Sequence, residues 1–168
     1  MTLTTHAIVG AAMASLVPQE PVLGFVLGFI SHFALDSIPH WAEGPALLRS
    51  MIKNKQNVLK TNTKGGVDLV HDMLVVSADS LLGIAGAVLL FFYLFHVPLY
   101  IVLLGAVAGQ TPDGLQFIYF KTHWRWMDKL QLFHNAIQEE YASLLYLLRE
   151  AGIIGAVVVL GLLGAFVV

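Results

Sequence analysis

Two histidines and an aspartate lie at equal four-residue steps in the stretch 31-SHFALDSIPHW-41, at the end of an apolar segment. Residues four apart on a helix share one face, so His32 and Asp36 point the same way. Ionisable groups in such a segment are energetically expensive and usually functional. Imidazole and carboxylate ligands without sulfur suit Zn²⁺, with Mn²⁺ and Fe²⁺ as alternatives. The spacing therefore predicts a divalent metal site, with zinc as the first choice.

Simpler interpretations of these residues remain open. His32 and Asp36 could form a hydrogen bond that locks two helices together. Pro39 disfavours a helical conformation at Ile38, so the helix could end there and turn His40 to solvent. His40 stays among the candidate ligands.

The elements that must position these residues are expected to be membrane helices. The chain is 57% hydrophobic and only 12% charged, with a mean hydropathy of +0.76. Soluble domains carry about 25% charged residues, and long apolar runs indicate an integral membrane protein. The absence of cysteine excludes disulfides, thiolate ligands and a cysteine nucleophile. We expect a single all-α membrane domain over residues 1–168.

The sequence predicts a bundle of about five transmembrane or membrane-buried helices. Their expected ranges are residues 3–17, 22–38, 67–95, 99–111 and 152–168, with 112-PDG-114 ending the fourth. Spanning a membrane takes about 20 helical residues, so the first and fourth are short and could be re-entrant or lie in a thinned bilayer. A polar loop at about 42–66 and one or two amphipathic helices at about 115–149 complete the chain.

Charge predicts the orientation of this bundle. When the segments are threaded alternately across a membrane, all nine Lys and Arg residues fall on the side of the N-terminus. Positive charge marks the cytoplasmic face, so we expect a multi-pass protein with a cytoplasmic N-terminus. Membrane lipids are the expected partners, and no nucleic acid is predicted. The pattern 24-GFVLG-28 would let two copies pack, which leaves an oligomer open.

The same threading gathers ionisable side chains at the cytoplasmic end. Six of the seven histidines and ten of the eleven acids fall there. His6, followed by Gly10 at a spacing that permits close helix approach, comes from the first segment. Asp113 comes from the fourth, although its 112-PDG-114 context could be simple turn chemistry. His134 comes from the amphipathic region, where a solvated helix face is the alternative.

The third segment adds three acids on one helix stripe. Asp68, Asp72 and Asp79 fall within an arc of about 40°, where like charges in a low dielectric repel each other and a divalent cation would relieve them. We predict that Asp72 or Asp68 acts as a general base. The predicted metal ligands are His6, His32, Asp36, His40, Asp79, Asp113 and His134.

Four short motifs support a family resemblance. The stretches 5-TH-x3-G-10, 31-SHFALDSIPHW-41, 111-TPD-113 and 133-FHN-135 resemble small bacterial proteins known as membrane-bound metal-dependent hydrolases. The core 32-HFALDSIPH-40 is also similar to the H-x3-D segment of zinc-dependent phospholipase C and related zinc nucleases. The resemblance implies a bacterial inner-membrane location and hydrolysis, with a phosphoester as substrate. It also implies metal binding by His6, His32, Asp36 and Asp113, with His40 and His134 as further candidates.

Three functions compete at this point. The leading hypothesis is a hydrolase whose metal-activated water attacks a phosphoester, such as a phospholipid, at the cytoplasmic face. A metal or proton transporter is the second, but stretches such as 81-LLGIAGAVLLFF-92 leave the distal half of the bundle apolar. The third is a non-catalytic membrane scaffold, which would have a closed, structural metal site.

Overall fold

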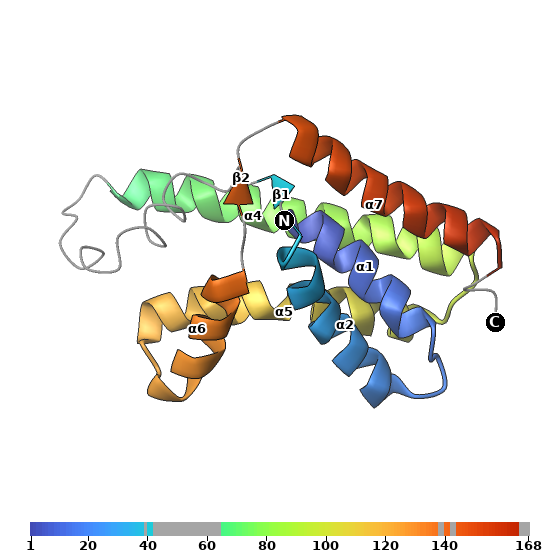
Figure 1. The fold of residues 1–168 in the computed structure, drawn as a ribbon, viewed down its shortest axis with the longest axis horizontal. Coiled ribbons are helices and arrows are strands. Elements are labelled where there is room, and N and C mark those ends of the chain that lie inside the picture. The colour runs from blue at the N-terminus through green and yellow to red at the C-terminus, as the bar shows by residue number, and fades with distance from the viewer. Residues whose placement is uncertain (39, 42–64, 138–139, 142–143, 165–168) are drawn as a thin grey trace.

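The described part of the chain is helical apart from one pair of two-residue strands. The computed structural model describes residues 1–38, 40–41, 65–137, 140–141 and 144–164. The predicted loop 42–66 lies outside the described residues except for its last two positions. Figure 1 shows the elements, which are α1 (Leu3–Ser15), α2 (Pro21–Asp36), β1 (His40–Trp41), α4 (Gly65–Ala87), η1 (Val88–Leu94), α5 (Leu99–Thr122), η2 (Arg125–Met127), α6 (Asp128–Ile137), β2 (Glu140–Tyr141) and α7 (Leu144–Leu162).

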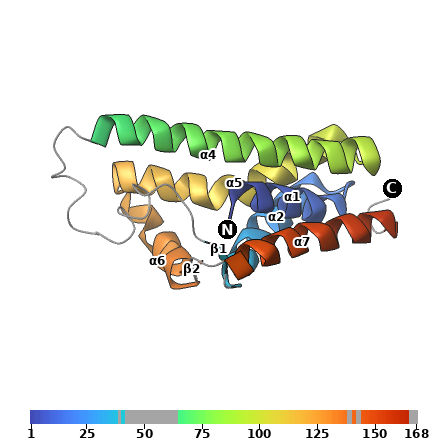
Figure 2. The same cartoon turned by 90° about the horizontal axis from the view of Figure 1, so that it is seen from above.

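The helix formed by α4 and the π-helical η1 is long, apolar and largely uncovered (Figure 2). Among the described residues it contains the one stretch, Met73–Leu94, that is long and apolar enough to cross a membrane. Only 17% of its apolar window is buried inside the protein, and Leu81 and Leu82 are 65% and 68% exposed. The helices α1 and α2 are apolar but shorter. The all-helical prediction is confirmed for the described residues, where length and apolar composition give one candidate membrane span rather than the five expected helices.

Small residues let α1 and α5 pack backbone against backbone. A Cβ atom on Gly10 would collide with the carbonyl oxygen of Gly105, and one on Gly109 would collide with that of His6. Such close approach needs glycine, because any side chain would push the helices apart. The expectation that Gly10 permits a neighbouring helix is confirmed. Helix α1 also contacts α2, α4 and α7, and so lies at the centre of the bundle (Figure 1).

The prediction that 112-PDG-114 ends a helix is wrong, because α5 continues through Pro112 to Thr122. Proline removes one backbone donor from a helix, which favours a break there. Tertiary packing overrides that preference, since Pro112 is fully buried and α5 contacts α1 and α2 as well as α6. The consequence for function is that Asp113 is held on a helix rather than in a turn.

The predicted amphipathic region 115–149 is shared among the end of α5, η2, α6 and the start of α7. The strands β1 and β2 pair in parallel, with His40 opposite Glu140 and Trp41 opposite Tyr141. This pairing brings the segment after α2 beside the segment after α6. Helix α6 itself contacts α2 and α5.

Candidate metal centre

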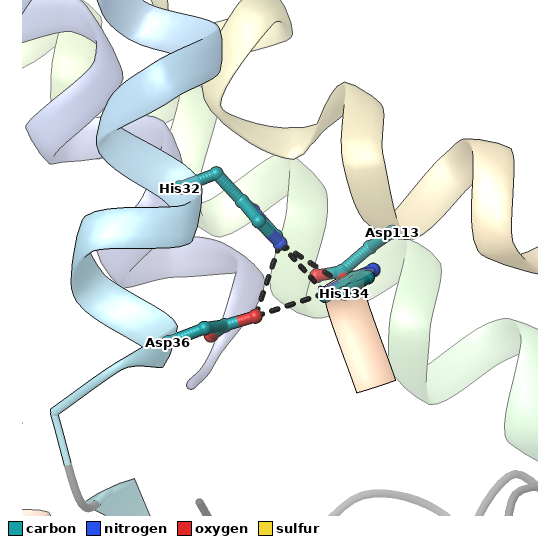
Figure 3. Close-up of side chains that lie close together, drawn as sticks. All are labelled: His32, Asp36, Asp113 and His134. Atoms are coloured by element: carbon teal, nitrogen blue, oxygen red, sulfur yellow. Dashed lines mark hydrogen bonds and ion pairs between the residues drawn. The ribbon is translucent and has the colours of Figure 1, made fainter. Parts of the chain in front are cut away.

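Four side chains from three helices converge at one end of the bundle (Figure 3). His32 and Asp36 lie one turn apart on α2, Asp113 projects from α5, and His134 projects from α6. Each offers one ligand atom, and these four atoms all lie within 4.8 Å of one another. The group could hold a metal ion.

Five distances within this group lie near the donor spacing of a tetrahedral metal site. His32 Nε2 lies 3.1 Å from His134 Nε2, and Asp36 Oδ2 lies 3.2 Å and 2.9 Å from these two nitrogens. Asp113 Oδ1 lies 3.6 Å and 3.7 Å from the same nitrogens. A tetrahedron with bonds of 2.0–2.1 Å has donor–donor edges of about 3.3–3.4 Å. These five distances bracket this length.

The tautomer of His32 also fits a metal ligand. Its Nδ1 lies 2.8 Å from the carbonyl oxygen of Gly109. A carbonyl only accepts hydrogen bonds, so Nδ1 carries a proton, and in the neutral ring the Nε2 lone pair would be directed towards Asp36. Metal-ligating histidines commonly use this arrangement, in which a backbone carbonyl fixes the ring. Without a metal ion, a proton on Nε2 would be needed for a favourable contact with the carboxylate oxygen of Asp36 at 3.2 Å.

Three of the four side chains are almost fully buried, which favours a cation between them, and the fourth is partly exposed. The side chains of His32, Asp36 and His134 are at most 1% exposed, whereas that of Asp113 is 25% exposed. A buried carboxylate needs a compensating positive charge nearby. Solvent therefore reaches the group from the side of Asp113.

His6 lies against this group on the other oxygen of Asp36. Its ring stacks on that of His32 with centroids 4.0 Å apart, and its Nε2 lies 3.2 Å from Asp36 Oδ1. The contact between His6 and Asp36 does not have hydrogen-bond geometry. Both ring nitrogens of His6 are buried and lack a hydrogen-bond partner in the described part of the chain. The α-amino nitrogen of Met1 lies 3.4 Å from the same oxygen. His6 is thus next to the centre but outside the group of four.

Asp79 is not in the group, and its carboxylate caps the start of α1. Its Oδ2 accepts a hydrogen bond from the backbone N–H of Leu3 at 2.7 Å, and its Oδ1 accepts one from the Thr4 hydroxyl at 2.6 Å. From α7, Glu150 Oε2 accepts hydrogen bonds from the backbone N–H and the hydroxyl of Thr2 at 3.2 Å and 3.0 Å. Carboxylates at a helix N-terminus satisfy free N–H groups and oppose the helix dipole. The first turn of α1 is therefore clamped between α4 and α7.

The structure does not describe the side chains of three predicted site residues. Asp68 and Asp72 are placed only by their backbone in the first half of α4, and His40 only by its backbone in β1. Their predicted roles as general base and metal ligand remain predictions.

Sequence reasoning missed several groups around the centre. The backbone carbonyl of Gly109 leaves no side-chain pattern in the sequence. Glu150 lies 145 residues from Thr5, and its carboxylate accepts a hydrogen bond from the Thr5 hydroxyl. Phe33 packs edge-on against His32 and His134, with centroid distances of 5.4 Å and 5.5 Å. The sequence did contain one hint, because Phe33 adjoins His32 on the helix.

Comparison of the chain with protein-family models, with curated proteins and with solved structures finds no match. The group itself consists of two imidazoles and two carboxylates, which α2, α5 and α6 bring together.

Proposed function

We propose that this protein is a membrane-embedded, metal-dependent hydrolase that acts on a phosphoester, with a lipid-like substrate. The observation that supports the proposal most directly is the four-donor group of His32, Asp36, Asp113 and His134, which has near-tetrahedral spacing and one partly exposed member. Nitrogen and oxygen donors without sulfur favour zinc, with manganese or iron as alternatives.

The proposed location is the bacterial inner membrane, with several membrane helices and a cytoplasmic N-terminus. The apolar, mostly uncovered stretch Met73–Leu94 supports membrane insertion. Outward-facing apolar residues on other helices support further membrane contact, including Val22 on α2, which is 80% exposed, and Leu162 on α7, which is 66% exposed. The one-sided distribution of Lys and Arg supports the orientation. The His–Asp group would then lie near the cytoplasmic headgroups, within reach of a lipid phosphoester.

Each residue of the group has a distinct role in this proposal. His32, Asp36 and His134 hold the ion in the buried part of the site, and the Gly109 carbonyl orients His32. A bound divalent ion supplies a nucleophile by lowering the pKa of its water towards neutrality. Asp113 marks the side from which water and substrate enter, because it alone of the four is solvent-accessible beyond 1%. The general base is proposed to be Asp72 or Asp68.

Metal analysis combined with an ester assay tests this function. We expect purified protein to contain about one zinc per chain or more, given the complete donor set found among the described residues. It should release phosphate or a phosphorylated headgroup from lipid or nucleotide esters, and His32→Ala should lose both metal and activity. Wild-type protein without bound metal, or unchanged hydrolysis in His32→Ala, would reject the proposal.

A non-catalytic scaffold with a structural metal is the second candidate. It is favoured by the four protein donors, which could fill a tetrahedral shell and leave no position for water. Cobalt substitution separates the two functions, because the absorption of a catalytic centre shifts when an anion or substrate replaces its water. An unresponsive spectrum, together with unfolding on chelation, would favour the scaffold.

Transport is less well supported. A conduit needs polar groups through the whole membrane depth, whereas the buried core on the other side of the bundle contains Phe91, Val97 and Ile101, all fully buried. Zinc uptake into proteoliposomes would revive this alternative.

A further inference from the structure

Helix α6, which carries His134, exposes two large apolar side chains and buries two polar ones. Its inward side bears Gln131 and His134, which are 2% and 1% exposed. Its outward side bears Leu132 and Phe133, which are 62% and 52% exposed. A surface helix of a soluble domain turns its apolar residues inward and its polar residues to water. The outward side of α6 is therefore suited to an apolar environment.

The turn before α6 adds residues typical of a membrane–water boundary. Trp124 and Trp126 are 51% and 69% exposed, and their rings lie 6.2 Å apart. Arg125 and Lys129 are exposed beside them. Tryptophan concentrates at the headgroup level of a bilayer, and Lys and Arg are attracted to anionic lipids. This combination of apolar, indole and cationic groups complements an anionic lipid surface.

A row of aromatic rings joins this surface to α2. The ring centroids of Phe25 and Phe29 lie 6.4 Å apart, those of Phe29 and Phe33 lie 5.4 Å apart, and those of Phe33 and Phe133 lie 5.3 Å apart. The outward apolar side of α2 thus continues onto α6. Figures 1 and 2 show α6 beside the half of α5 that extends past α1 and α2, which places it at the end of the bundle.

We propose that α6 is an interfacial helix whose outward side binds the headgroup boundary of an anionic bilayer, and that this attachment holds His134 in the metal centre. The proposal rests on the membrane location in the proposed function. We define the α6 lipid face as Trp124, Trp126, Leu132 and Phe133.

The coupling follows from the two sides of one short helix. His134 lies 2.9 Å from Asp36 Oδ2 on the inward side, while the lipid face lies on the outward side. Two side-chain hydrogen bonds also tie α6 to α5, between Gln116 and Asn135 at 3.1 Å and between Tyr119 and Asp128 at 3.0 Å. The hydrogen bond to the Asp128 carboxylate raises the pKa of Tyr119. Lipid contact would add to these few restraints and limit the movement of His134.

Fluorescence quenching tests the attachment without needing metal or hydrolysis. The chain has three tryptophans, so a Trp41→Phe variant reports only Trp124 and Trp126. The variant is reconstituted in phosphatidylglycerol–phosphatidylcholine vesicles that contain lipid brominated near the headgroup or near the chain end. We expect strong quenching by the shallow bromine and weak quenching by the deep one. Absence of quenching by either lipid, with emission typical of indole in water, would overturn the proposal. Protection through self-association, seen as a dimer in the same vesicles, would also overturn it.

Zinc affinity tests the coupling. We expect Leu132→Ser combined with Phe133→Ser to weaken zinc binding about tenfold in anionic nanodiscs, as for residues that orient a ligand. The matched control replaces Leu81 and Leu82 by serine, because these residues are at least as exposed as Leu132 and Phe133 but lie on α4. Unchanged affinity in the α6 variant, with folding confirmed by circular dichroism, would overturn the coupling. If zinc fails to bind even to wild type but quenching is observed, the hydrolase proposal fails and the membrane attachment of α6 stands.

Discussion

The Nε2 atoms of His32 and His134 lie 3.1 Å apart, although 102 residues separate them in the chain. Asp36 Oδ2 lies within 3.2 Å of both nitrogens. Three donor atoms from two helices therefore meet at one buried point. Removal of any one of them should damage the centre more than removal of a histidine elsewhere.

His32→Ala and His134→Ala should each weaken zinc binding by on the order of 100-fold or more, since they remove a ligand rather than an orienting partner. Competition with a chromophoric chelator measures this affinity. His123→Asn is the control, because His123 is exposed and its positive φ of 49° suits asparagine. Equal affinities in the two alanine variants and the control would exclude a metal site in this group.

Asp113→Asn should reduce hydrolysis more than it reduces metal binding. The amide keeps the shape and one oxygen donor but loses the charge at the exposed side of the group. We expect zinc affinity to fall about tenfold and kcat to fall further. Steady-state kinetics at saturating zinc separates the two effects. Glu20→Gln is the control, because Glu20 is exposed and lies just before α2, at the end opposite Asp36. An Asp113→Asn enzyme with wild-type kcat would show that the reaction does not use this side.

Gly109→Ala should destabilise the protein, because its new Cβ atom would meet the His6 carbonyl oxygen. The atoms that this Cβ would meet belong to the backbone and cannot rotate away. We therefore expect a loss of about 1–3 kcal/mol in the free energy of unfolding, with weaker zinc binding as α1 and α5 separate. Gly114→Ala is a matched control on the same helix, since nothing lies within 4 Å of the added atom. That change should be neutral or stabilise by up to about 1 kcal/mol. Denaturant unfolding followed by circular dichroism measures both, and equal stabilities would contradict the close helix contact.

Asp79→Ala should lower stability by about 1–2 kcal/mol, the usual effect of losing a helix N-cap. Its oxygens accept hydrogen bonds from the first turn of α1, so the metal content should stay at the wild-type value. Asp79→Asn should lose less stability, because its amide oxygen can still accept one of these bonds. Thermal unfolding and metal analysis of the same samples decide between the roles. Loss of metal in Asp79→Asn at wild-type stability would make Asp79 a ligand after all.

Local sequence patterns were enough to predict the helical character of the chain and the pairing of His32 with Asp36. Both depend on local rules: apolar composition selects helices, and a four-residue step puts two side chains on one face. The sequence also indicated that Gly10 allows a close neighbour, which the contacts of Gly105 and Gly109 confirm. These features need no knowledge of which helices become neighbours.

Only the tertiary structure decided which distant groups share the centre. Asp113 and His134 join His32 and Asp36 because α5 continues through Pro112 and α6 packs on α2. Asp79 has the side-chain type and helix position of a ligand, yet its carboxylate accepts a hydrogen bond from the N-terminus of α1 instead. The physical reason is that a side chain's chemistry is set by its type, whereas its partner is set by how closely neighbouring helices can approach, and that depends on packing over the whole bundle.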